Sequence, residues 1–535
     1  MEKKLNYSIM RSIIRLPLEK ATTVQSSTVK SQNMAFYLTE LVALLRSRRW
    51  LFLLGTVSEL VYVFYLLQTF PLLRYFQSQT DLGGITRYSQ AGFLTFVIVF
   101  SFLFVAFGLA WWEAHSYQDR ATLWIILSFG SIFALTTVFV YPITALDIFF
   151  YIARSLILVQ YHLNPMVVAP SNFPHDPLMQ LANLVIHLPS PYGPLAQIIQ
   201  ALPLLIAGRN VLASLLLFKF IFSAIIIISA FLIYKILSHT APKFAIPGAL
   251  ALAWNPFVLL QYSANSHNDI VMMFFIILAV FALVKKRHVW AMTFITASVL
   301  IKYASLVIVP LFFIYSFMQQ PTKKERITYT FKATVVFLSI TIDSFVLFWA
   351  GQQTFQRSFN QAQGYLYSFC VFLVDILSGN NISLVDNIFS GKHGYEYTRD
   401  IGWVLFGICF LYALWLSSRD FSSMLKGCFI TMFTLLAFGT TFVQPWYFIW
   451  PFVFAILIPR LSVSLACFLM LYGATLAELV HAYIFAWAGP GYGNILVISS
   501  SIVYITIFLP PALFLLASRF KPILSQGPAS QERNL

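Results

Sequence analysis

Asp147 is the side chain in this sequence with the clearest means of acid–base chemistry. It follows an apolar run directly and opens an amphipathic stretch, with Tyr151 four residues and Arg154 seven residues further on. A helix would place all three on one face. On that face a carboxylate can accept a proton from an attacking hydroxyl, and a guanidinium can grip a phosphate. The alternative is a helix cap followed by an arginine that snorkels to the membrane interface.

Lys302 stands in the middle of a 30-residue apolar run, 289–318. Charged side chains are rare in such positions and indicate a function, here contact with an anionic lipid phosphate, although snorkelling is the alternative. As one helix the run would be about 45 Å long, against an apolar membrane core of about 30 Å. We therefore expect two short helices that turn at Lys302, rather than one tilted span. Lys219, inside another apolar run, raises the same question.

The segment 265–269, Asn-Ser-His-Asn-Asp, places polar side chains between two apolar runs, where they are costly to keep. His267 and Asp269 could bind a sugar hydroxyl or a phosphate. The alternative is a tight polar turn that caps the next helix. The segment has too few ligands for a metal site, so we expect no metal.

Three other outer segments carry candidate side chains. Tyr192 lies in Pro-Tyr-Gly-Pro, a rigid turn sequence, and Asp176 is either a second acid or a solvated loop charge. Trp446 belongs to an aromatic cluster that ends at Trp450. Aromatic faces suit a sugar ring or an isoprenoid chain, but an interfacial aromatic belt predicts the same residues.

The elements that must position these side chains are membrane helices. Of the 535 residues 59% are hydrophobic and only 10% charged, whereas soluble domains carry about a quarter charged residues. Apolar runs of about 18 residues or more indicate membrane spans. We therefore expect an all-α polytopic membrane protein with about 13 transmembrane helices and further interfacial helices and loops at its outer face. The expected ranges, with 289–318 divided, are 50–70, 91–112, 122–141, 211–234, 244–262, 269–284, 289–302, 303–318, 333–351, 400–417, 426–443, 446–459, 461–487 and 494–517.

The bias of Lys and Arg predicts the topology. It makes residues 1–49 a basic cytoplasmic tail, 50–518 the transmembrane domain and 519–535 a short cytoplasmic tail. The main outer loops are then 142–194 and 352–399, while 195–208 is too short to assign. A single span at 289–318 would instead put Arg519 and Lys521 outside.

The net charge of +15 does not indicate nucleic acid as a partner. The excess lies in the N-terminal tail and in short loops, so topology and anionic lipid headgroups explain it. The four cysteines show neither metal-ligand spacing nor a disulfide framework.

Taken in order, these motifs resemble the GT-C class of integral-membrane glycosyltransferases. The nearest likeness is to the polyprenol-phosphate-mannose-dependent α-mannosyltransferases of bacterial envelopes. That family often has Gly before Asn-Pro and Tyr after it, where this chain has Leu163 and Met166. The resemblance rests on Asp147…Tyr151…Arg154, Asn164-Pro165, Pro191-Tyr192-Gly193-Pro194, Asn255-Pro256…His267-Asn268-Asp269, Lys302 and Trp446-Tyr447.

The resemblance implies transfer of a hexose, mannose by the nearest likeness, from a polyprenyl-phosphate donor to a glycan or lipid acceptor on the outer face of a plasma membrane. It implies no cofactor beyond the lipid-linked donor. By this likeness Asp147 is the catalytic base, and Arg154 and Lys302 bind the donor phosphate. The sugar and the acceptor would contact Tyr151, Tyr192, His267, Asp269 and Trp446.

Two other functions remain open at this point. A secondary transporter would also use charges within the membrane, but with repeated halves and a site near the midplane. We find no repeat, and the polar residues gather toward one side. A polysaccharide polymerase or ligase would share the lipid-phosphate chemistry and the outer loops.

Overall fold

The computed structural model describes residues 48–362, 364–378, 394–488 and 495–520, and within them every regular element is helical. The predicted tails, 1–49 and 519–535, fall almost wholly outside these ranges. So does the middle of the predicted outer loop 352–399. The prediction of an all-α protein is confirmed for the described part of the chain.

Nine helices in the described ranges are long and apolar enough to cross a membrane, which makes this a multi-pass membrane protein. Several of the nine include a π-helical or 3₁₀ turn that continues the same rod. The nine are α3 and η1 (Arg48–Val61, Tyr62–Leu67), α6 (Gln90–Ala114), α7 (Arg120–Val138), α10 (Val211–Thr240), the rod of η4, α11, α12 and η5 (Pro242–Ala264), α20 (Gly394–Ser417), α21 and η7 (Phe421–Thr434, Leu435–Gly439), the rod of α23, η9 and α24 (Leu461–Ala488), and α25 (Ile495–Phe520).

Shorter apolar helices complete the bundle. All fourteen predicted ranges fall on helices, although 333–351 lies on α16 (Lys323–Phe345), which begins earlier and is not among the nine. The segment 195–208 is also a helix. The number of helices that cross the membrane therefore stays a prediction. The shorter helices are α9 (Pro194–Ala207), α13 (Asp269–Val284), α14 (His288–Ile301), η6 and α15 (Tyr303–Ile308, Val309–Met318), and η8 and α22 (Pro445–Phe448, Ile449–Leu457).

Side-chain caps fix where several long helices begin. A cap oxygen accepts a hydrogen bond from a backbone N–H that the first helical turn leaves free. α16 has a full capping box, in which Thr322 and Glu325 bind each other's backbone N–H groups. Single caps are Ser89 for α6, Asp119 for α7, Asn210 for α10 and Asp420 for α21.

The chain reverses direction at Lys302. α14 ends at Ile301, Lys302 is extended (φ −148°, ψ 122°), and η6 and α15 lead back along the bundle. Residues 286–290, before the reversal, and Gln320, Thr322, Lys324 and Glu325, after it, line one cleft. In the same region the ring of His288 lies 6.2 Å from the ring of Tyr315. The predicted hairpin is therefore confirmed, and the single tilted span is excluded.

The turns before and after the hairpin lie at one end of the molecule, which we call the basic end. There the rings of His115 and Phe244 lie 5.5 Å apart, which joins the turn after α6 to the turn after α10. Lys285 Nζ lies 2.9 Å from His239 Nε2, which joins the turn after α10 to the turn after α13.

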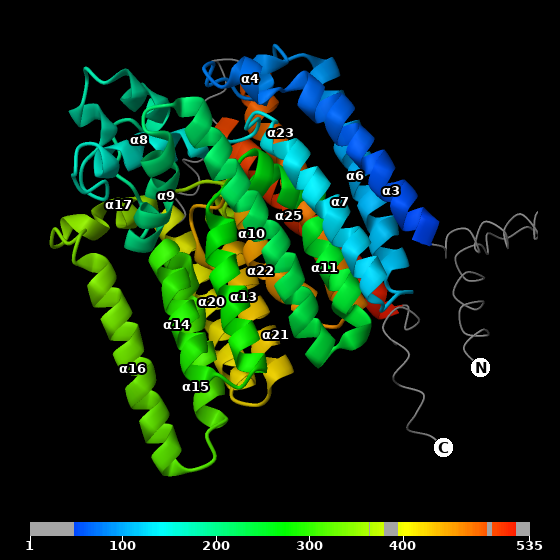
Figure 1. The fold of residues 1–535 in the computed structure, drawn as a ribbon, viewed down its shortest axis with the longest axis vertical. Coiled ribbons are helices and arrows are strands. Elements are labelled where there is room, and N and C mark those ends of the chain that lie inside the picture. The colour runs from blue at the N-terminus through cyan, green and yellow to red at the C-terminus, as the bar shows by residue number, and fades with distance from the viewer. Residues whose placement is uncertain (1–47, 363, 379–393, 489–494, 521–535) are drawn as a thin grey trace, which may run out of the picture.

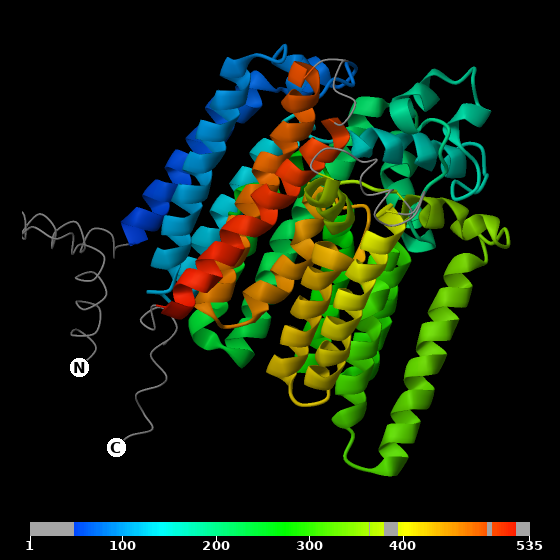
Figure 2. The same ribbon diagram turned by 180° about the vertical axis from the view of Figure 1, so that it is seen from behind.

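The opposite end, where Lys302 lies, is the site end. Figure 1 shows α8 (Asp147–Val159), α9 and α17 (Gln353–Ala362) grouped there, above α14 and beside the upper part of α10, where the rings of Tyr151 and Phe218 lie 6.2 Å apart. Both views show α16 along one flank of the molecule and α3 along the other (Figures 1 and 2). The predicted outer loop 142–194 thus folds as a cap of short helices over the bundle.

Candidate active site

Lys302 forms a buried ion pair with Asp269. Its Nζ donates a hydrogen bond to Asp269 Oδ1 at 2.8 Å, and the side chains are 14% and 1% exposed. Trp450 Nε1 donates to the same oxygen at 2.7 Å. A carboxylate taken out of water needs such compensation, because an unpaired buried charge is costly. Asp269 therefore holds Lys302 in place, and the Lys302 side chain does not snorkel freely to the membrane interface.

Aromatic rings surround the Lys302 ammonium. Its Nζ lies 4.0 Å from the centroid of the Tyr447 ring, 5.1 Å from that of Trp450 and 6.0 Å from that of Tyr192. Tyr447 and Trp450 stack on each other at 4.5 Å and are buried. Rings at these distances stabilise a cation that has lost its water. The aromatic-belt interpretation is thus wrong for Tyr447 and Trp450, which face the interior of the site end.

Asp147 begins α8 and faces the 265–269 segment. Its Oδ2 lies 3.8 Å from Nδ1 of His267, and the Asp147 side chain is 20% exposed. The His267 ring stacks on Trp446 at 4.0 Å with an interplanar angle of 14°. His267 and Asp269 lie just before and at the start of α13, and Lys302 directly follows α14. The structure therefore brings Asp147, Asp269, His267, Lys302 and Trp446 to one end of the protein.

The pKa of Asp147 is raised to about 6, mainly because burial disfavours the charged carboxylate. The nearby charges of Arg154 and Lys302 act in the opposite direction and lower the pKa of Asp147, while the charge of Asp269 raises it. The carboxyl group thus titrates close to neutral pH, which suits a group that accepts and releases a proton.

Tyr151 and Arg154 lie beneath the turn that carries Tyr192. The hydroxyls of Tyr151 and Tyr192 lie 3.5 Å apart. Arg154 is 4% exposed and donates from Nη2 to the carbonyl oxygen of Leu188 at 3.3 Å. Its Nε has no hydrogen-bond partner within the described residues. Tyr151 therefore supports Tyr192, Arg154 binds the segment that precedes the turn, and neither side chain lines the cavity next to Lys302.

The Pro-Tyr-Gly-Pro turn packs against the end of α14. Gly193 N donates to the carbonyl oxygen of Ile301 at 3.1 Å. A Cβ atom at Gly193 would lie 2.2 Å from the carbonyl oxygen of Leu300, so only glycine allows this approach. The turn and Lys302 are therefore positioned relative to each other by direct backbone contact.

The segment 265–269 is buried but only partly paired. From beneath, Lys219 donates to the carbonyl oxygens of Ser263 and Ala264. Lys219 therefore supports the segment that precedes His267. Buried polar atoms without partners are rare in folded proteins, and several together indicate a place for a polar ligand or water. Within the described part of the chain the unpaired atoms here are Asn265 Oδ1, His267 Nδ1 and Nε2, Asn268 Oδ1 and Nδ2, and Asp269 Oδ2.

A cavity of about 360 Å³ lies beside this cluster, between the end of α14, α17, α20 and η7. Lys302, Tyr192 and Trp450 line it on one side, and Arg399 lies on another. The rest of the wall is mostly apolar, with Ala304, Val307, Trp403, Leu435 and Phe442 among its side chains. The arrangement can hold an anionic group next to Lys302 and an apolar chain beyond it.

Several residues of the site end were not found from the sequence. Arg399 lies in the loop predicted to be outside, but its charge alone does not distinguish it from a solvated arginine. The sequence around Trp450 fits an interfacial belt as well as a binding site. Asp176 is neither a second acid nor a solvated loop charge, because it caps η3 (Pro177–Val185) and pairs with Arg209 at 2.6 Å. No group of three or more His, Cys, Asp or Glu side chains in the described ranges is placed to hold a metal ion.

Comparison with known proteins finds a family match. Residues 53–318 match the family described as "Alpha-(1->6)-mannopyranosyltransferase, N-terminal domain", a range that includes Asp147, His267 and Lys302. The chain is 22% identical over 359 residues to Alpha-(1->6)-mannopyranosyltransferase A of Mycobacterium tuberculosis. That alignment covers 64% of this chain and 66% of the relative, slightly less than two thirds of the relative's length. The predicted resemblance is confirmed, because residues 53–318 of this chain match the alpha-(1->6)-mannopyranosyltransferase family.

Proposed function

We propose that this protein transfers mannose from a polyprenyl-phosphate donor to a glycan or lipid acceptor at the outer face of a plasma membrane. The observation that carries the proposal is the position of Lys302, a cation on the wall of a largely apolar cavity, in contact with a buried carboxylate and aromatic rings. A lipid phosphate matches this chemistry, because its charge meets the ammonium and its chain meets the apolar wall. The family match supports mannose as the sugar.

In the proposed reaction the oxygen of an acceptor hydroxyl attacks the anomeric carbon of mannose. The new C–O bond forms as the bond from the anomeric carbon to the phosphate oxygen breaks, so the configuration at this carbon inverts. The proton of the hydroxyl passes to the carboxylate of Asp147. The electron pair of the broken bond leaves with the polyprenyl phosphate.

Asp147 is a better candidate for the base than Asp269. The Asp147 side chain is 20% exposed, whereas that of Asp269 is 1% exposed. One oxygen of Asp269 already accepts hydrogen bonds from Lys302 and Trp450, which hold it as a charged partner. A base must reach the hydroxyl that it deprotonates, and this condition favours Asp147.

Lys302 is the proposed group that stabilises the departing phosphate. An ammonium has three N–H donors, and Asp269 engages one of them, so the others can serve the phosphate. Arg399 also lines the cavity, where it is a second cation that already pairs with Asp400 at 3.0 Å. Arg154 stays a predicted phosphate ligand. It is buried, and its positive charge lowers the pKa of Asp147, which supports a second role in adjusting the base.

The remaining predicted residues would shape the space for sugar and acceptor. Trp446 offers an aromatic face beside His267, and aromatic faces suit the apolar side of a sugar ring. Tyr192 lies on the cavity wall, where its hydroxyl can bond a sugar hydroxyl or the phosphate, and Tyr151 supports it.

Charge distribution supports an orientation with the site end outside and both chain termini in the cytoplasm. The basic end carries the turns with Lys285, Lys286 and Arg287, and with Lys323, Lys324 and Arg326. Cytoplasmic loops are enriched in Lys and Arg. This placement puts Asp147 and Lys302 on the extracytoplasmic side, where a lipid-linked donor rather than a nucleotide sugar would be the substrate.

Transfer assays in vesicles with the purified full chain test the proposal. Radiolabelled polyprenyl-phosphate mannose should give labelled product with a mannose-terminated glycan or glycolipid acceptor, and GDP-mannose should give none. Product with the nucleotide sugar alone would contradict the proposed donor. Transfer of a preassembled glycan in one step would indicate a ligase. Solute uptake by the vesicles, without transfer from any lipid-linked donor, would indicate a transporter.

A further inference from the structure

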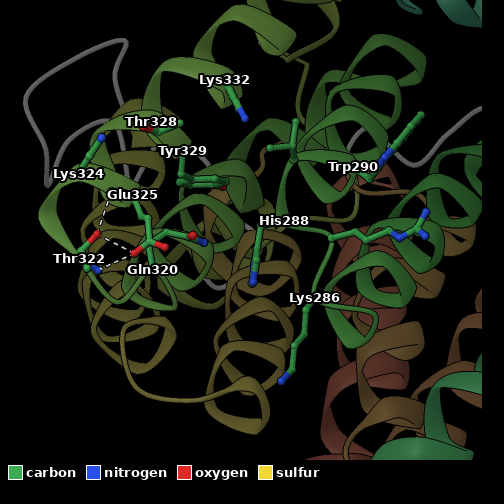
Figure 3. A pocket seen from close by; sticks show the side chains of 12 residues that line it. Lys286, His288, Trp290, Gln320, Thr322, Lys324, Glu325, Thr328, Tyr329 and Lys332 are labelled. Carbon is green, nitrogen blue, oxygen red and sulfur yellow. Dashed lines mark hydrogen bonds between the residues drawn. The ribbon is translucent and has the colours of Figure 1, made fainter.

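A second cavity, distinct from the site, lies at the basic end of the molecule. It is a cleft of about 790 Å³ between the start of α14 and the first half of α16. Because α14 has 14 residues, this cleft and Lys302 lie at opposite ends of a helix about 20 Å long. Figure 3 shows Lys286, Lys324 and Lys332 on different sides of the cleft, with His288 between them.

The charge of the cleft is strongly positive and poorly compensated. Four cations line it, Lys286, Arg287, Lys324 and Lys332, against a single acid, Glu325. Glu325 accepts hydrogen bonds from the backbone N–H and the hydroxyl of Thr322 at 3.1 Å and 2.6 Å, so it already serves the helix cap. None of the four cations forms an ion pair with another described residue. Their mutual repulsion would fall if an anion occupied the cleft.

Two buried polar atoms in the cleft lack partners, as expected for a site that receives a ligand. Tyr329 is only 4% exposed, and its hydroxyl lies near that of Ser316 but makes no hydrogen bond of ordinary geometry in the described ranges. Nδ1 of His288 is buried and unpaired in the same way. The Tyr329 ring lies 5.6 Å from that of Phe313 and 6.4 Å from that of His288, so the hydroxyl is held in place by packing. Such atoms call for a partner that the protein does not supply.

The surroundings of the cleft match the boundary between lipid tails and headgroups. Next to the cations, α16 exposes large apolar side chains, with Ile327 at 70% and Phe331 at 69%. Trp290, which lines the cleft, is 54% exposed, and tryptophan is enriched at the membrane–water interface. An amphipathic molecule in the cleft would therefore have cations around its polar end and exposed apolar side chains of α16 beside its apolar end.

We infer that this cleft binds the phosphate headgroup of an anionic phospholipid, with its acyl chains along the exposed apolar face of α16. A free phosphate would satisfy the cations but would not use that face. The site is independent of the proposed transfer reaction, because none of its residues belongs to the cavity beside Lys302. Its place between α14 and α16 means that a bound lipid would join the first arm of the Lys302 hairpin to the helix that follows the hairpin.

Native mass spectrometry of the full chain, released from phosphatidylcholine nanodiscs with added phosphatidylglycerol, tests the inference. The wild type should retain one phosphatidylglycerol more than the double variant Lys324→Gln/Lys332→Gln, whose apparent affinity should fall about tenfold or more, since each surface cation contributes about 1 kcal/mol. Tyr329→Phe should reduce retention less, because it removes one donor and no charge. All three proteins should keep wild-type mannose transfer.

The matched control is Lys235→Gln/Lys243→Gln, which removes the same charge from the last part of α10 and from η4, at the same end but outside the cleft. It should retain phosphatidylglycerol as the wild type does. Equal retention by both double variants and the wild type would overturn the inference. Full displacement of the retained lipid by millimolar inorganic phosphate would also overturn it, since it would identify a site for a soluble anion.

Discussion

The ammonium of Lys302 lies 2.8 Å from Oδ1 of Asp269, a residue 33 positions earlier in the chain. This contact joins the end of α14 to the start of α13, next to the cavity and the Asp147–His267 contact. The two charges are mutual partners in the resting protein, and Lys302 is also the cation that we propose meets the donor phosphate. Its structural and chemical roles can therefore be separated by mutation.

A double-mutant cycle on Lys302 and Asp269 should separate them. Lys302→Met or Asp269→Asn alone leaves one buried charge unpaired and should lower the free energy of unfolding by about 3 kcal/mol. The double variant carries neither charge and should recover most of that stability while transferring no mannose. Thermal unfolding in detergent and the transfer assay measure the two effects. Recovery of activity along with stability would show that Lys302 serves only the fold.

The pH dependence of transfer should show the titration of Asp147. A base acts in its ionised form, so kcat/KM should fall as the pH drops through about 6, the raised pKa of Asp147, rather than near 4. Arg154→Gln removes a charge that lowers the pKa of Asp147, so its acid limb should move to higher pH. Arg460→Gln, an exposed charge after α22, is the control and should leave the limb in place. An identical limb for wild type and Arg154→Gln would contradict this assignment.

The length of the apolar run around Lys302 was sufficient to predict the hairpin, because bilayer thickness limits how long a spanning helix can be. The same reasoning placed Asp147 and Lys302 at one end of the protein. The residues that contact Asp147 and Lys302 could not be predicted from the sequence. Trp450 meets Asp269 across 181 positions, and no local pattern distinguishes such a tryptophan from one at the membrane interface.

The roles of the two acidic side chains Asp176 and Asp147 depended on contacts in the folded protein. Asp176 and Asp147 both lie in the predicted outer segment 142–194. Only the folded chain shows that Arg209 pairs with Asp176, while Asp147 faces a histidine without a hydrogen bond. Helix positions followed from the length of the apolar runs, because lipid forces the backbone to satisfy its own hydrogen bonds. Contacts between distant helices depend on tertiary packing, which composition does not encode.

Gly193→Ala should uncouple the Pro-Tyr-Gly-Pro turn from α14. The added Cβ would lie 2.2 Å from the carbonyl oxygen of Leu300, so the turn must move and carry Tyr192 away from the cavity. We expect a loss of about 1 to 3 kcal/mol in stability and a higher KM for the donor. Gly108→Ala is the matched control, since nothing lies within 4 Å of its Cβ. Equal donor KM values for the two variants would exclude a positioning role for this contact.

Trp446→Ala should weaken sugar binding more than it slows the chemical step. The substitution removes the ring that stacks on His267 at 4.0 Å, and aromatic faces contribute about 1 kcal/mol to such contacts. We expect KM to rise about fivefold to tenfold with little change in kcat, and Trp446→Phe to restore most of the binding. Initial rates over a range of acceptor and donor concentrations measure both constants. A large fall in kcat with unchanged KM would argue against a sugar-binding role.

The most direct test of the account is the rate of mannose transfer from labelled polyprenyl-phosphate mannose by Asp147→Asn, compared with wild type and with Asp343→Asn. Asp343 is an exposed acid on α16, so it controls for loss of one negative charge. Asparagine fills nearly the same space as aspartate but cannot accept the proton, so we expect transfer to fall at least about a hundredfold, with stability and donor binding close to wild type and Asp343→Asn fully active. Transfer by Asp147→Asn at the wild-type rate would contradict the assignment of Asp147 as the base.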